Sequence, residues 1–132
     1  MRARLALALL SFYLGIQVFY TFLVTPALFK LLGTETAGKV VARIFPVYFG
    51  LGALTGLLAF LLSRSKLARF CSFVLFAVMS AEAFYLEPLM SRLKLENYEL
   101  FLKYHGLSAA LNLAAMAAAF TAAAYLVLKG EE

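Results

Sequence analysis

The decisive stretch of this chain is Gly106–Leu128, GLSAALNLAAMAAAFTAAAYLVL, which contains no aspartate, glutamate, lysine or arginine. A helix of about 20 mainly apolar residues crosses the roughly 30 Å hydrocarbon core of a bilayer. Three earlier stretches have comparable length and hydrophobicity: Leu5–Thr25, Ile44–Leu62 and Leu67–Leu86. Because lipid offers no water to backbone N–H and C=O groups, such stretches must be helical. The sequence therefore predicts four transmembrane helices.

The composition supports the same class of protein. Of the 132 residues, 64% are hydrophobic and 14% are charged, against about 25% charged in soluble domains. Four spans use about 80 positions, so we expect residues 1–132 to form a single domain. The predicted fold is all-α, an integral membrane four-helix bundle with antiparallel up-down connections. A cleavable signal peptide is the alternative for the N-terminus, but the apolar run after Arg4 continues past Phe22, beyond the usual 7–15 residues.

The net charge of +5 comes from cations that flank the spans. These cations are Arg2, Arg4, Lys30, Lys39, Arg43, Arg64, Lys66, Arg69, Arg92, Lys94, Lys103 and Lys129. Their placement favours contact with anionic lipid headgroups over nucleic-acid binding. They divide evenly between the two sides, but Arg2, Arg4 and the loop Arg64–Arg69 lie closest to span ends without a nearby acid. We therefore expect a multi-pass membrane protein with both termini in the cytoplasm.

Two amphipathic segments precede the second and fourth spans and are expected at the membrane interface: Thr34–Arg43 and Arg92–His105. Small residues within the spans predict close helix packing. They are the GxxxG pair Gly52 and Gly56, and an alanine every fourth position at Ala110, Ala114, Ala118 and Ala122. Besides the lipid bilayer, the expected partners are further copies of the chain or other membrane helices.

Three polar residues in three different spans are predicted to lie in one layer. Because spans alternate in direction, Gln17, Glu82 and Asn112 all fall roughly 9–12 Å below the same membrane surface, at 1.5 Å rise per residue. Polar groups within spans normally face the bundle interior or a wet cavity. We therefore expect a polar pocket there. Its candidate residues are Gln17, Glu82, Asn112, Tyr13, Thr21 and Ser108, with Arg43, Tyr48, Glu87, Tyr104 and His105 at its mouth.

Each of these residues also has a structural interpretation. Gln17 and Asn112 are equally typical of interhelical hydrogen bonding. Glu82 is either a neutral hydrogen-bond donor or a working proton or cation site. Glu87 at the boundary is explained by solvation or by pairing with Arg43 or Arg92.

No enzyme signature is present, and we expect no catalytic residue, metal or cofactor. The chain lacks a Ser/His/Asp set, HExxH, P-loop and CxxC. Cys71 is the single cysteine, which excludes an internal disulfide. His105 is the single histidine, and hydrogen bonding at a helix end accounts for it better than metal or haem ligation. The seven tyrosines are expected mostly in interfacial belts.

Several segments together resemble the transmembrane protein 205-like family, a domain of unknown function. They are GIQVFYTF from Gly15, Phe29-Lys30, IFPVYF from Ile44, Leu86-Glu87-Pro88, and YHGLS from Tyr104 followed by Leu111-Asn112. The resemblance covers nearly the whole chain and implies a small four-span membrane protein. Animal relatives have been linked to tolerance of platinum drugs, without an agreed substrate. Glu82 departs from the neutral Asn often found there in relatives.

Three functional hypotheses follow. The first is a small transporter or channel-like component for a cation or small polar solute, using the predicted pocket. The second is a scaffold or assembly factor whose small-residue faces bind partner helices. The third, a haem- or quinone-linked membrane component, depends on His105 and nearby aromatic residues.

Overall fold

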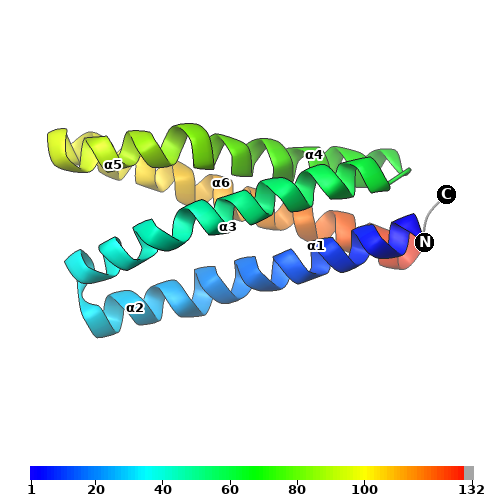
Figure 1. Ribbon diagram of the computed structural model, residues 1–132, viewed down its shortest axis with the longest axis horizontal. Coiled ribbons are helices and arrows are strands. Elements are labelled where there is room, and N and C mark those ends of the chain that lie inside the picture. The colour runs from blue at the N-terminus through cyan, green and yellow to red at the C-terminus, as the bar shows by residue number, and fades with distance from the viewer. Residues whose placement is uncertain (130–132) are drawn as a thin grey trace.

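The computed structural model describes residues 1–129, and within them the chain is a bundle of long helices (Figure 1). The elements in chain order are α1 (Arg2–Phe19), η1 (Tyr20–Val24), α2 (Thr25–Leu32), α3 (Thr34–Leu62), α4 (Lys66–Ala81), η2 (Glu82–Leu86), α5 (Glu87–Glu96) and α6 (Tyr98–Lys129). Here η denotes a π-helical turn. Because η1 and η2 join their neighbours without a break, the described residues form four continuous rods. The prediction of an all-α four-helix bundle is confirmed.

Each rod packs against two others. The α1 helix contacts α3 and α6, and α4 also contacts α3 and α6, which places α1 and α4 at diagonally opposite corners. The start of α1, the α3–α4 connection and the end of α6 lie at one end of the bundle (Figure 1). The α2–α3 and α5–α6 connections lie at the other end, which we call the loop end.

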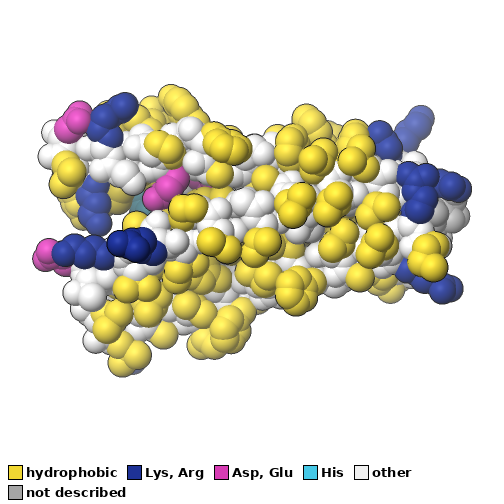
Figure 2. Space-filling view, in the orientation of Figure 1, with side chains coloured by type: hydrophobic (Ala, Val, Ile, Leu, Met, Phe, Trp, Pro, Cys, Tyr) yellow, Lys and Arg dark blue, Asp and Glu magenta, His cyan; other side chains and the backbone are white. Residues whose placement is uncertain are grey.

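The rods are longer than a hydrocarbon core is thick. They contain 29 to 32 residues and therefore span about 45 Å each, against a core of about 30 Å. The two predicted interfacial segments are not separate helices, because they continue directly into α3 and α6. Figure 2 shows hydrophobic side chains across the middle of the bundle and Lys and Arg side chains at both ends. These features are those of a multi-pass membrane protein.

The two π turns occupy matching places in the first and third rods. Each ends two residues before a proline: η1 ends at Val24 before Pro26, and η2 ends at Leu86 before Pro88. Proline lacks the N–H that would bond the preceding turn, and a π turn re-pairs the backbone around such a break. The helices consequently continue through both prolines as α2 and α5, beyond the span ends expected near Thr25 and Leu86.

Small residues bring α3 and α4 into backbone contact. Both Gly52 and Gly56 are buried, and a Cβ atom added at Gly56 would lie 2.5 Å from the backbone nitrogen of Phe76.

At the end opposite the loop end, two arginine side chains contact the last residues of α3. Arg2 donates a hydrogen bond of 2.7 Å to the Leu61 carbonyl, and Arg69 lies over the Phe60 ring at 4.1 Å.

The predicted alanine face of α6 is displaced from the face that packs in the bundle. Of the predicted residues, Ala122 is buried, Ala118 is half-buried, and Ala110 and Ala114 are exposed. The small residues that do pack inside are Ala115, Ala119, Ala122 and Ala123. A strict four-residue step advances about 40° around a helix each time. A row with that spacing therefore leaves the buried face, which follows mixed steps of three and four residues.

Candidate functional site

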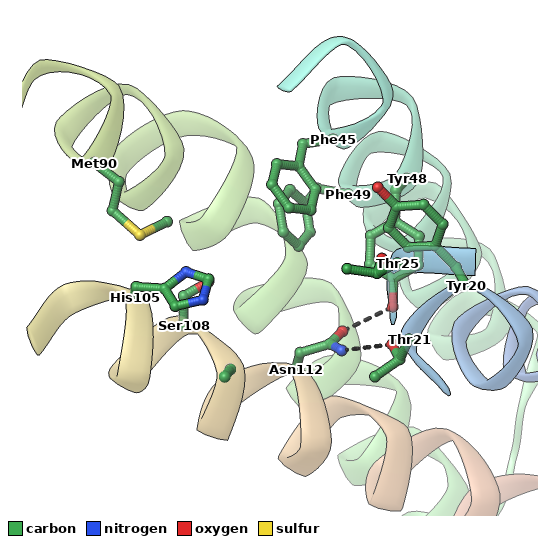
Figure 3. A pocket seen from close by; sticks show the side chains of 11 residues that line it. Tyr20, Thr21, Thr25, Phe45, Tyr48, Phe49, Met90, His105, Ser108 and Asn112 are labelled. Atoms are coloured by element: carbon green, nitrogen blue, oxygen red, sulfur yellow. Dashed lines mark hydrogen bonds between the residues drawn. The ribbon is translucent and has the colours of Figure 1, made fainter. Parts of the chain in front are cut away.

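A cavity of about 200 Å³ opens at the loop end of the bundle. It lies between two pairs of packed segments, α2 with α3 and α5 with α6, and Figure 2 shows the hollow between them on the left. Its lining comes from η1, α2, α3, α5 and α6 (Figure 3) and comprises Tyr20, Thr21, Thr25, Phe45, Tyr48, Phe49, Met90, His105, Ser108, Ala109 and Asn112. Of the six predicted pocket residues, Thr21, Ser108 and Asn112 line this cavity.

A chain of hydrogen bonds through Asn112 crosses one wall of the cavity (Figure 3). The Tyr48 hydroxyl donates to Asn112 Oδ1 at 2.8 Å, and Asn112 Nδ2 donates to Thr21 Oγ1 at 2.9 Å. The three residues come from α3, α6 and η1, so the chain ties three rods together. Tyr48 was predicted at the mouth, but it is only 4% exposed because its ring turns inward to reach Asn112.

Glu82 lies immediately behind the lining. Its side chain is 0% exposed, and the Ser108 hydroxyl lies 2.7 Å from one carboxyl oxygen and 2.8 Å from the other. A serine hydroxyl carries a single proton, so it satisfies only part of the acceptor capacity of an ionised carboxylate. Among residues 1–129, Glu82 makes no salt bridge. Contrary to the expectation that Glu82 lines the pocket, Ser108 stands between its carboxyl group and the cavity.

Gln17 is buried one helical turn below the lining. It precedes Thr21 by four residues and therefore shares its helix face, and its side chain is 0% exposed. Neither Oε1 nor Nε2 of Gln17 has a hydrogen-bond partner among residues 1–129. Buried amides are normally hydrogen-bonded, so an unpaired one marks a place where water or a ligand is expected.

Tyr13 closes the bundle one turn further from the loop end. Its hydroxyl donates to the Tyr48 carbonyl at 2.7 Å and lies 3.4 Å from the sulfur of Met79. The Tyr13 hydroxyl and the Met79 side chain together occupy the space that a Cβ atom would need at Gly52. Tyr13, which was predicted in the pocket, therefore fills the bundle interior beyond the cavity and is not part of the cavity lining.

The residues predicted at the mouth separate into two groups. His105 is exposed and lines the cavity. Its ring stacks on the Phe101 ring with the two ring centroids 5.8 Å apart. Arg43 is exposed and Tyr104 is half-buried, and neither belongs to the lining. Glu87 is half-buried, and the cation that acts on it electrostatically is Lys94. Lys94 lies seven residues further along the same helix, on the same face.

The main feature that sequence reasoning missed is an aromatic wall, which we define as the cavity-lining rings of Tyr20, Phe45, Tyr48 and Phe49. Ring centroids lie 4.9 Å apart for Tyr20 and Tyr48, 5.2 Å for Phe45 and Phe49, and 5.3 Å for Tyr48 and Phe49. Tyr20 was expected in an interfacial belt, but it is buried against these rings. The usable signal was the spacing of Phe45, Tyr48 and Phe49, which places three rings on one face of α3. Thr25, Met90 and Ala109 carried no such signal.

The described residues offer no ready metal site. Among residues 1–129, no group of three or more His, Cys, Asp or Glu side chains comes together. Cys71 is buried within α4 and lies outside the cavity lining. The polar groups at the cavity are hydroxyls, an amide, an imidazole and a carboxyl behind Ser108. Such groups bind a small polar molecule through hydrogen bonds.

Comparisons with known proteins place the chain in a family. The family model described as "Domain of unknown function (DUF4149)" matches residues 8–99. A protein of Aquifex aeolicus (strain VF5), described as an uncharacterized protein, is 46% identical over 116 residues, which cover 86% of this chain and 88% of the relative. No solved structure matches the chain. Neither match carries the transmembrane protein 205-like name. The matched length and the identity show that this membrane protein belongs to the family of the domain of unknown function DUF4149.

Proposed function

We propose that this protein binds a small polar solute or cation in the cavity at the loop end and carries it across the membrane. The main support is the unpaired Gln17 amide buried beneath a cavity that contains Thr21, Ser108 and Asn112. A polar group that is buried in a membrane protein is costly unless it is paired. A site that holds water or solute accounts for this cost, whereas purely structural hydrogen bonding would leave Gln17 paired.

The one-sided shape of the site favours a carrier over an open channel. Tyr13 and Met79 fill the interior on the side away from the loop end, while the cavity opens toward the loop end. A carrier exposes its site to one side at a time, and such a state is one member of its conformational equilibrium. With the termini in the cytoplasm, as the basic residues predict, this state would open to the opposite side of the membrane.

Flux measurements test the proposal. Purified protein in proteoliposomes is assayed with a panel of labelled monovalent cations and small neutral polar solutes, and the Asn112→Ala and Glu82→Gln variants are compared with wild type. We expect saturable flux of at least one solute and its loss in both variants. Thr121→Ala is the matched control, because Thr121 lies on the same helix but is exposed outside the cavity. Flux that is equal in all four proteins would contradict the proposal.

A second candidate function is supported by the outer face of α6. Ala110, Ala114 and Ala117 are exposed there, and small residues allow another membrane helix to approach closely. A scaffold or assembly role would use this face to bind a partner helix. We then expect membrane proteins that copurify with wild type to be lost with Ala114→Leu, while helical content stays unchanged. A monomer without partners in mild detergent would argue against this role.

A further inference from the structure

We infer that the ligand of the cavity is a small organic cation, an amine or a quaternary ammonium ion. This inference rests on the proposed function, because it names the class of solute for the same site. It is carried by the aromatic wall, by two acidic side chains next to the cavity and by the hydrogen-bond acceptors that face it.

The rings of the aromatic wall gather at one side of the cavity (Figure 3). Tyr20, Phe45, Tyr48 and Phe49 all line the cavity, and adjacent rings contact one another at centroid distances of 4.9 to 6.3 Å. The faces of aromatic rings carry negative quadrupole potential and attract cations within about 6 Å. Groups of such rings are a common means of binding quaternary ammonium ions.

The charges around the cavity favour a positive ligand. Glu82 is 0% exposed and makes no salt bridge among residues 1–129, and Glu87 is half-buried one turn further along the same rod. Within the described chain, no lysine or arginine belongs to the lining. Lys94 is outside the lining, with its Nζ placed 2.9 Å from where a Cβ at Gly38 would be. An anionic ligand would therefore find no lysine or arginine in the lining, and Glu82 lies directly behind Ser108.

The lining also has acceptors suited to an N–H or O–H group of the ligand. When the Ser108 hydroxyl donates its proton to Glu82, the lone pairs of Oγ remain available on the cavity side. Asn112 Oδ1 accepts from Tyr48 and retains a second lone pair. A metal ion would instead require several closely spaced oxygen ligands, and residues 1–129 contain no cluster of three acidic, His or Cys side chains. The volume of about 200 Å³ limits the ligand to a small molecule.

Binding of choline to the full-length protein in lipid nanodiscs tests the inference. Choline is compared with its uncharged carbon isostere, in which a tert-butyl group replaces trimethylammonium, and with the neutral solute glycerol. We expect choline to bind at least about tenfold more tightly than the isostere. Phe45→Leu removes a ring face but stays apolar, and it should weaken choline binding by about 2- to 30-fold, the range known for cation–π contacts. The same variant should leave the isostere unaffected.

Two further variants separate a site effect from a folding effect. Glu82→Gln keeps the side-chain shape and a hydrogen-bond acceptor for Ser108 but removes the ionisable carboxyl group, so it should weaken choline binding and not isostere binding. Phe84→Leu makes the same chemical change as Phe45→Leu at a ring that is 82% exposed on the outside of η2. It should leave choline binding unchanged. Choline affinity that falls equally in Phe84→Leu and Phe45→Leu would contradict the inference.

The remaining outcomes distinguish this inference from the proposed function. If the isostere or glycerol binds as tightly as choline and binding is lost in Asn112→Ala, the cavity is a solute site but the cation inference is wrong. If no compound binds and no solute of the flux panel depends on Asn112, both the inference and the proposed function are wrong.

Discussion

The contact between α3 and α4 at Gly56 gives the sharpest quantitative prediction. A methyl group at this position would lie 2.5 Å from the Phe76 nitrogen, 2.8 Å from the Phe76 Cα and 2.9 Å from the Ser72 carbonyl oxygen. All three obstacles are backbone atoms of a neighbouring helix, which no side-chain rotation can move aside. Gly56→Ala must therefore separate the two helices by about 1 Å, since ordinary contacts require 3.4 Å or more.

The expected destabilisation follows from the cost of overpacking. Forcing extra atoms into a well-packed interior costs about 1–3 kcal/mol. For a chain of this size, each 1 kcal/mol lowers the Tm by about 4 °C, so Gly56→Ala should lower the Tm by about 4–12 °C. Thermal unfolding in a mild detergent, followed by the helical circular dichroism signal, measures this shift.

Gly50→Ala is the matched control for this prediction. It makes the same substitution in the same helix, and an added Cβ at Gly50 meets nothing within 4 Å. Because alanine is the better helix former, Gly50→Ala should leave the Tm unchanged or raise it slightly. An equal loss in both variants would mean that the close approach of α3 and α4 at Gly56 is not the cause of the destabilisation. An unchanged Tm for Gly56→Ala would show that the close approach of α3 and α4 is wrong.

Three other predictions concern the packing of Tyr13 and Met79 against Gly52, the hydrogen bond from Tyr48 to Asn112, and the orientation of the protein in the membrane. Gly52→Ala should lower the Tm by less than Gly56→Ala, because the atoms in the way belong to the side chains of Tyr13 and Met79 and not to a helix backbone; a larger loss would contradict this. Tyr48→Phe removes the donor to the α6 amide and should reduce the free energy of unfolding by about 0.6–1.7 kcal/mol; no change would show that this bond is not formed in the membrane. In a Cys71→Ser background, Lys94→Cys should react with an impermeant maleimide only from the side opposite the termini; labelling from the cytoplasm would reverse the predicted orientation.

The depth of the polar layer could be predicted from the sequence, because rise per residue and alternating direction fix it. That reasoning placed Gln17, Glu82 and Asn112 at one level, and of these three only Asn112 lines the observed cavity, while Gln17 and Glu82 are fully buried next to it. It could not fix the angular position of each side chain. A π turn adds a residue to the turn and rotates the following helix by about 100°. Nothing in the hydropathy of the third span predicts such a turn at Glu82.

The aromatic wall was missed for a different physical reason. A tyrosine at the edge of a span is equally compatible with an interfacial belt and with the interior. The choice depends on which face the helix turns inward. Tyr20 turns inward because it begins the π turn before Pro26 and packs against Tyr48. The alanine spacing in α6 predicted close packing, and within the bundle only its Ala122 end is buried, because a four-residue step drifts about 40° around the helix each time.

Accessibility of Ala109 to an aqueous reagent tests most directly the claim that a solvent-filled cavity opens at the loop end. Ala109 lines the cavity, whereas the adjacent Ala110 is exposed outside it at nearly the same depth. With Cys71→Ser as background, Ala109→Cys in sealed proteoliposomes should react with a small impermeant thiol reagent applied from the loop-end side, and Ala110→Cys should react far more slowly. Equal reactivity of the two positions, or no reaction at Ala109→Cys, would contradict the account.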